Sequence, residues 1–540
     1  MVIGFRKPKY QLEFQISPPS DNILCTSMPK NFKKQKIVGA LLALTGIISL
    51  ILIGLYLYPS SNRVSGFSEL LSANDVAAYL EFPVATENPL VGKIADSLKV
   101  NWGEEILPWA GENGAFVFLA QTDATKKIPQ KLLPYIIIKI NSAKNAYDFL
   151  ANYSNPNKTI KKNTINGVDT YETPSMNFSI LSDSVILASS ADGLGALITS
   201  SSNADTSLAA EKNFVKTRQY LTNSVFLYLK PKLLPKSFLN YITENFSNAP
   251  EMDFAIDSIG IGADKKDDVW QGKSYARLSH ELSREQLAVE QGYRALLLPY
   301  LPTNFEFLLA GQDLKSQMVK IDALIENNKL TKLSTLTKYL TNKYLPGIDF
   351  EKEISPLISG EFAFSYNNGK YLLILQPPTF AENDAIKKIR ESFLKIAGEF
   401  TPVARQVKLP DGTLAEELIP DPVQIKSYSE QFMGIGIRGL LLGRNVAETP
   451  FYKTKEDIYD ADAQNKWFIS NDLATLRKAL ALTKEPGENF RDSEKYARTL
   501  TPIMENPELL GVSTYQGGVF SFSKRTFTDA METNFVFEGN

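Results

Sequence analysis

The sequence predicts an α+β protein, with a single N-terminal transmembrane helix followed by two diverged copies of one α+β module with mixed or antiparallel sheets. Three observations support this fold class: an apolar run near the N-terminus, alternating strand-like and helix-like patterns after it, and a return of the same pattern order in the second half. The predicted boundaries are 1–36 for a basic tail, 37–58 for the membrane segment, 59–283 for the first copy, and 284–540 for the second copy with an insertion near 430–465.

Composition narrows the classes of function. The chain has 540 residues, of which 44% are hydrophobic and 22% charged, as is typical of a folded globular protein. The net charge of −2 gives no electrostatic reason to expect a nucleic acid as partner. Cys25 is the sole cysteine and His280 the sole histidine, which excludes an intrachain disulfide and a zinc site of the usual His/Cys type. A surface or capping role is favoured for His280.

The segment 37–58, IVGALLALTGIISLILIGLYLY, carries no charge and as a helix is long enough to cross the hydrocarbon core of a bilayer. Lysine and arginine are frequent before it, whereas Arg63 is the only base directly after it. The positive-inside rule therefore predicts a single-pass cell-membrane protein with a cytoplasmic N-terminus and residues 59–540 outside. A cleaved signal peptide is disfavoured by the long apolar core and by YPSSNRVSG, which offers no good cleavage motif. The tail before the segment lacks a sustained period and is predicted to be disordered.

The first copy reads as a series of strands and helices. Alternating apolar positions predict strands at 77–82, 114–120, 135–140, 177–181, 184–190 and 224–230. Apolar positions on one helical face predict helices at 142–153, 191–202, 209–221 and 236–246. The charged centre ADKKDD, flanked by apolar alternation, predicts a hairpin over 253–278.

The second copy repeats this order. EEILPWAGENGAFVFLA (104–120), which predicts a short helix, a turn and a strand, returns as KEISPLISGEFAFSYNN (352–368). Five further segments of the first copy are matched at 297–311, 371–378, 383–400, 467–482 and 494–503, which gives six matched elements in unchanged order. So many matches in unchanged order predict a duplicated module.

Three segments of the first copy resemble the signature segments of a bacterial family known as domain of unknown function 3352: LLSANDVAAYLEF (70–82), ILPWAGE (106–112) and LASSADGLGALI (187–198). The pair Asn113–Gly114 departs from the acid and β-branched residue expected there. The resemblance implies a short cytoplasmic tail, one transmembrane helix and a long outer region with a duplicated order. It implies no established activity and no catalytic residues.

Two short motifs suggest ligands but lack the required context. GIGIRG, with Gly434, Gly436 and Gly439, matches a dinucleotide fingerprint, but no helical period follows it, so a glycine-rich strand is predicted. DADAQN (460–465) places acidic residues as a calcium loop does, but Asn465 replaces the essential glycine and Asn471 the bidentate glutamate. A solvated loop is predicted there. The acidic Asp264, Asp267 and Asp268, interleaved with lysines, are predicted in an exposed hairpin turn.

Two further patterns contain residue types that are used in catalysis. SFSK (521–524) has the spacing of serine–lysine acyl enzymes, but the partner motifs are absent and the context is strand-like. Glu112 and Glu361 lie at equivalent places of the repeated phrase, each beside a glycine, and are interpreted as turn residues that hold backbone N–H groups. No residue is predicted to be catalytic, to bind a cofactor or to bind a metal.

The predicted function is that of a membrane-tethered, extracytoplasmic scaffold or interaction protein of the bacterial cell envelope, without enzymatic activity, whose partner is another envelope protein or the cell wall. Two alternatives stay open. A carboxylate-based extracytoplasmic hydrolase requires two facing carboxylates in a concave pocket. A small-molecule or lipid-binding module requires a large apolar cavity.

Overall fold

The structure is a computed structural model in which the chain divides into two compact units, 1–48 and 49–540. All the described residues belong to the second unit, and they span 66–539 with the exceptions of 85–100, 123–128, 155–159, 173–176, 189, 202–203, 235–254, 267–268, 284–286, 288–292, 325–331, 346, 379–383, 400–401, 421–424, 443–456, 486 and 516–517. The predicted tail, the membrane segment 37–58 and the helix at 236–246 lie outside the described residues. Within the described part, no helix has the length and hydropathy needed to span a bilayer.

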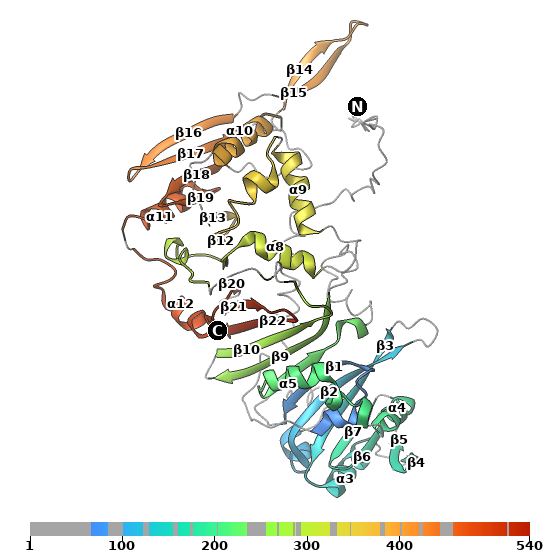
Figure 1. The fold of residues 1–540 in the computed structure, drawn as a ribbon. Helices are drawn as coiled ribbons and strands as arrows, with labels where there is room; N and C mark the ends of the chain where they lie inside the picture. The colour runs from blue at the N-terminus through green and yellow to red at the C-terminus, as the bar shows by residue number, and fades with distance from the viewer. Residues whose placement is uncertain are drawn as a thin grey trace, which may run out of the picture. The chain divides into compact units, whose positions relative to one another are not determined.

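The first half of the described chain follows the predicted order of strands and helices (Figure 1). Each strand and helix predicted there from the periodicity of its apolar residues is present wherever the structure describes the residues. The elements are η1 (Gly66–Leu70), β1 (Val76–Pro83), η2 (Trp102–Ile106), β2 (Ala110–Thr122), β3 (Pro129–Ile140), α3 (Ala143–Ser154), β4 (Lys161–Ile165), β5 (Val168–Glu172), β6 (Asn177–Leu181), β7 (Ser184–Ala188), α4 (Ala191–Ser201), η3 (Ala204–Thr206), η4 (Leu208–Ala210), α5 (Lys212–Tyr220), β8 (Val225–Leu229), η5 (Pro231–Leu233), β9 (Ile256–Lys266) and β10 (Val269–Leu278).

The second half contains a comparable series and several added elements. The α8–α9 helix pair follows β11, and the β14–β15 hairpin follows α10. The elements are η7 (Leu298–Tyr300), β11 (Phe307–Gly311), α8 (Leu314–Ala323), α9 (Leu333–Tyr344), η8 (Phe350–Ile354), β12 (Glu361–Asn367), β13 (Lys370–Gln376), α10 (Asp384–Glu399), β14 (Pro402–Lys408), β15 (Leu414–Pro420), β16 (Ile425–Phe432), β17 (Ile435–Leu442), β18 (Ile458–Ala463), β19 (Lys466–Ser470), α11 (Leu473–Ala481), α12 (Glu494–Thr499), η10 (Thr501–Ile503), β20 (Leu509–Tyr515), β21 (Gly518–Thr526) and β22 (Ala530–Glu538). Of the predicted insertion 430–465, the described residues belong to β16, β17, β18 and the turns beside them.

Twenty of the strands in the described residues form one antiparallel sheet that spans both halves, which confirms a mixed α+β fold with antiparallel pairing. The pairings of the first half run β4–β5–β6–β7–β3–β2–β1–β8–β9–β10. Those of the second half run β22–β21–β20–β11–β12–β13–β19–β18–β17–β16. The two series meet where β10 pairs with β22, from Val269 opposite Glu538 to Arg277 opposite Ala530.

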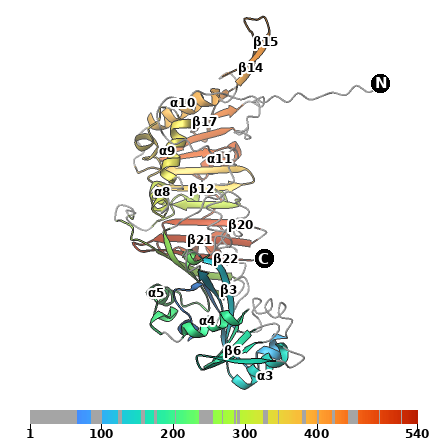
Figure 2. The same cartoon turned by 90° about the vertical axis from the view of Figure 1, so that its right-hand side faces the viewer.

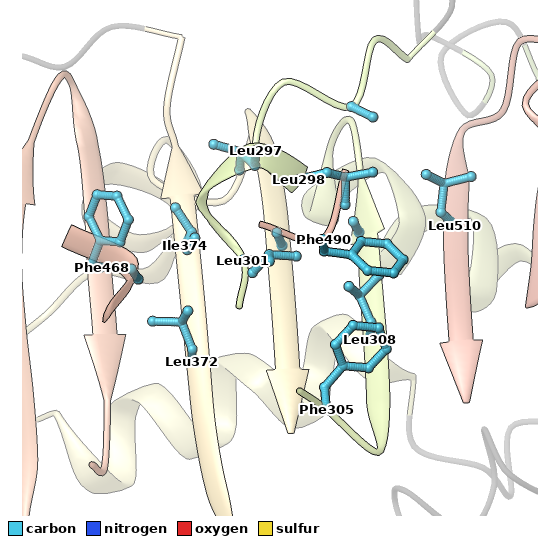
Figure 3. Packing of buried hydrophobic residues seen from close by; sticks show 14 of the residues in the cluster. Leu297, Leu298, Leu301, Phe305, Leu308, Leu372, Ile374, Phe468, Phe490 and Leu510 are labelled. Carbon is cyan, nitrogen blue, oxygen red and sulfur yellow. The ribbon is translucent and has the colours of Figure 1, made fainter. Parts of the chain in front are cut away.

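The largest described core lies on one face of the second half (Figure 3). Leu298 and Leu301, in and just after η7, are fully buried against strand residues such as Leu308 and Ile374. The ring of Phe305 packs edge-on against Phe490, with 4.9 Å between ring centroids. Alternate strand positions therefore supply this core, as the period-two pattern requires.

The repeated phrase begins with the same cap in both halves. In the first, the Asn101 side chain accepts from Glu104 N, and the Glu105 carboxylate accepts from Asn101 N at 2.6 Å. In the second, Asp349 accepts from Glu351 N and Lys352 N, and Glu353 accepts from Asp349 N at 2.7 Å. This reciprocal bonding satisfies the first N–H groups of η2 and η8, each a single π-helical turn.

Candidate interaction site

The β14–β15 hairpin lies outside the main sheet. Its two strands pair only with each other, from Pro402 opposite Pro420 to Lys408 opposite Leu414. Figures 1 and 2 show the hairpin extending away from α10 and from the neighbouring strands of the sheet. Near its base β15 approaches α10, but neither strand extends the main sheet, so the hairpin adds little to the hydrogen bonding that holds that sheet together.

The tip of the hairpin is held by a defined turn. Leu409 N donates to Thr413 O at 2.8 Å, and Gly412 N donates to Leu409 O at 2.9 Å. The Asp411 carboxylate accepts from the backbone N–H and the hydroxyl of Thr413, at 3.0 and 2.6 Å. Gly412 has a φ of 85°, a conformation that glycine adopts without strain. The turn fixes the positions of the residues on either side of it.

Two leucines flank this turn with their side chains in solvent. Leu409 is 42% exposed and Leu414 is 67% exposed, the latter more than any other large apolar side chain in the described part of the chain. Charged residues surround them, since Lys408, Asp411 and Glu416 are also exposed. Exposed apolar side chains with charged neighbours, presented by an ordered turn, have the composition of a protein contact site.

The sequence interpretation missed this hairpin. The available signal was LPDGTL (409–414), in which Asp-Gly lies in a short turn between segments of alternating polarity. Exposure of the two leucines was not predictable, because the same apolar positions would face a core if the hairpin packed on the main sheet.

Glu361, at the start of β12, has the architectural role expected of it. Its carboxylate accepts from Leu297 N at 2.8 Å and so holds the segment before η7 against the sheet. Burial raises the pKa of Glu361 to about 7, although the hydrogen bond from Leu297 opposes the shift. A near-neutral pKa is also found in catalytic carboxyl groups, so its surroundings decide the interpretation.

The predicted equivalence of Glu112 and Glu361 is wrong. In β2, Gly114 pairs with both neighbouring strands, β1 and β3, and in β12 Phe362 pairs in the same way with β11 and β13. The residue before Gly114 is Asn113 and the residue before Phe362 is Glu361, so Asn113, and not Glu112, occupies the position of Glu361. An irregularity in β2 between Ala110 and Gly114 displaces Glu112, which is exposed. From β2 to β12 the sheet advances nine strands at about 4.8 Å each, so these two carboxylates do not converge in one cleft.

The prediction of a solvated loop at 460–465 is also wrong for most of these residues. Asp460 and Asp462 lie on β18, where both form ion pairs with Arg390 of α10. The indole of Trp467 donates to Asp460 at 2.9 Å. Only Gln464 and Asn465 form a turn, with φ values of 50° and 58°. The carboxylates of this calcium-like pattern are therefore engaged by the half-buried guanidinium of Arg390.

The glycine-rich strand predicted for GIGIRG is confirmed as β17. Gly434, with a φ of 76°, belongs to the turn before it, and no helix follows in the described residues of this region. A Cβ on Gly439 would meet the Tyr459 ring at 2.7 Å, which shows the close packing expected of a strand glycine.

The remaining candidates do not assemble into a site. Ser521 and Lys524 are three residues apart on β21 and face opposite sides of the sheet, which rules out a serine–lysine pair. Asp264 is half-buried and accepts from Asn223 and Ser224, whereas Asp267 and Asp268 lie outside the described residues. His280 is exposed after β10. Among the described residues no three His, Cys, Asp or Glu side chains are grouped as metal ligands.

A hollow of about 480 Å³ lies between α9 and η8 and is lined by Lys338, Asn342 and 347–351. Lys338 and Glu351 form an ion pair across it at 2.7 Å. Its charged lining differs from the large apolar cavity that a lipid-binding module requires.

The sequence model of a family described as "Protein of unknown function (DUF3352)" matches residues 93–388. No curated protein matches the chain. Among solved structures, "Structure of crystal form I of TP0453" is similar at 13% identity and a TM-score of 0.27, covering 41% of this chain and 82% of that chain. "Structure of crystal form III of TP0453" is similar at 15% identity and a TM-score of 0.26, covering 41% and 84%.

Proposed function

The chain belongs to the DUF3352 family, whose function is unknown, and we propose that it is a membrane-tethered interaction protein of the bacterial cell envelope. In this proposal the hairpin tip with Leu409 and Leu414 binds another envelope protein. The exposed tip is the observation that carries the proposal, because burying the two exposed leucine side chains of this ordered, protruding turn against a partner is favourable.

The proposed tether is the apolar segment 37–58, with residues 59–540 outside the cytoplasm. It is supported by the length and hydropathy of the segment and by the concentration of lysine and arginine before it. Proteolysis of intact cells tests this orientation. Removal of the C-terminal region by added protease is expected, and full protection of that region would contradict it.

We further propose that the two halves of the sheet are diverged copies of one module. The strand pairings run in the same order outward from the β10–β22 contact, and matched caps begin η2 and η8. The β14–β15 hairpin and the α8–α9 pair have no counterpart among the described elements of the first half. A function located on the hairpin therefore belongs to the second half alone.

The test is a pull-down from solubilised membranes with the full-length, anchored chain. A variant carrying Leu409→Ser and Leu414→Ser is compared with the wild-type chain and with the control Lys408→Ser, which alters an exposed neighbour of the same tip. A partner recovered with the wild type and the control is expected to be lost with the double variant. Equal recovery of every co-purifying protein by all three chains would overturn the proposal.

A further inference from the structure

A second group of polar residues lies between α8 and the sheet. Gln317 and Lys320 are three residues apart and occupy one face of α8, toward β20 and β21. Glu508 directly precedes β20, and its backbone N–H donates to Lys524 O on β21 at 2.8 Å. The backbone therefore brings Glu508 and Lys524 together beneath the helix.

This group holds two ammonium groups for one carboxylate. Lys320 is 1% exposed, and its ammonium lies 2.8 Å from the Glu508 carboxylate. The other oxygen of Glu508 accepts from Thr526 N at 3.2 Å. Lys524 forms no ion pair with a described carboxylate, and burial together with the charge of Lys320 lowers its pKa to about 8. The nearby Asp313 caps α8 by accepting from Ser316 N, so its carboxylate is engaged there.

The amide of Gln317 provides a second, independent observation. The side chain is 4% exposed, and neither its nitrogen nor its oxygen has a hydrogen-bond partner among the described residues. A buried amide without partners is costly, and so is a half-buried cation without a counter-charge. A negatively charged group that accepts hydrogen bonds would supply a counter-charge for the Lys524 ammonium and a partner for the Gln317 amide nitrogen.

We propose that Gln317, Lys320, Glu508 and Lys524 form a binding site for a small carboxylate. One carboxylate oxygen accepts from the Lys524 ammonium, and the other accepts from the Gln317 amide nitrogen. Lys524 retains part of its exposure to solvent, so the ligand enters on its side. Lys320 is already paired with Glu508 and supplies positive potential from beneath.

The test uses sodium acetate as probe and the full-length chain. Acetate, compared with sodium chloride at equal ionic strength, is expected to raise the melting temperature to a plateau and to raise the pKa of Lys524 measured by NMR of its ammonium group. Lys524→Met and Gln317→Leu are each expected to weaken acetate binding at least tenfold. The control Lys315→Met removes an exposed lysine of the same helix and is expected to leave binding unchanged.

Three outcomes would overturn the site. Equal stabilisation of wild type and Lys524→Met by acetate would place the effect elsewhere. Saturable binding of inorganic phosphate in preference to acetate would contradict the carboxylate class. A crystal grown in acetate that shows an ordered water only, next to Lys524 and Gln317, would contradict binding itself.

Discussion

Glu361 is a residue whose structural role makes the stability of the fold depend on pH. Its carboxylate is half-buried beside the segment of Leu297 and Leu298, which begins the core of the second half. Burial removes solvation from the carboxylate, and the hydrogen bond from Leu297 N offsets only part of that loss, so the neutral form is favoured up to a pKa of about 7. In an unfolded chain the same carboxyl group titrates near its usual, lower pKa.

A pH prediction follows for this residue. Because its pKa is raised in the folded state, Glu361 contributes stability at low pH that is lost as pH rises from about 4.5 to about 7. The stability lost over this pH range amounts to about 3 kcal/mol of unfolding free energy. Urea unfolding at pH 5, 6 and 7.5 is expected to show a shallower decline for Glu361→Gln than for the wild type.

The matched control for this titration is Glu112→Gln, since Glu112 is exposed on β2. Its pH dependence is expected to follow the wild type. An unchanged slope in Glu361→Gln would show that burial of this carboxyl group does not control its ionisation.

Among elements, local sequence patterns had very different predictive value. Strands and helices such as β1, β3 and α3 were predictable because apolar periodicity is a property of consecutive residues. The role of Asp460 was not predictable from local sequence, because its partner Arg390 lies 70 residues away. The displacement of Glu112 was not predictable either, because the irregularity in β2 is defined only by the pairing of β2 with β3.

The β14–β15 hairpin is expected to be dispensable for folding. Pro402 and Pro420 are paired, so two or three glycines can replace 402–420 with little change in chain path. Because neither strand pairs with the main sheet, the melting temperature is expected to change by no more than about 2 °C. Differential scanning calorimetry measures this.

The control removes another hairpin, β4–β5. It belongs to the main sheet, because β5 pairs with β6 and Tyr171 stacks on Phe178 with 4.9 Å between ring centroids. Its excision is expected to lower the melting temperature clearly more. A large loss of stability on removing β14–β15 would show that this element does pack on the body of the protein.

At the scale of the whole molecule, the β10–β22 contact makes one sheet from two halves. No sequence pattern predicts it, because it joins residues 269–277 to residues 530–538, which are about half of the chain apart. Gly272 permits the close approach, since a Cβ there would meet Gly262 O at 2.4 Å and the Phe535 ring at 2.4 Å. We therefore expect the two halves to unfold cooperatively through this contact.

Gly272→Val is expected to destabilise the protein by about 2 kcal/mol or more and to separate the unfolding of the two halves into two calorimetric transitions. Gly66→Ala is the control, because a Cβ at Gly66 has no atom within 4 Å and its φ is not positive. A single transition for Gly272→Val at the wild-type temperature would contradict a role of the β10–β22 contact in cooperativity.

The proposed function is tested most directly by site-specific photo-crosslinking from position 414 in intact cells. A photoreactive residue replacing Leu414 lies at the most exposed apolar position of the tip, and one replacing Lys426 on strand β16 provides an exposed control. The account predicts a discrete crosslinked envelope protein from position 414 that is absent from position 426. The same products from both positions, or none from position 414, would contradict it.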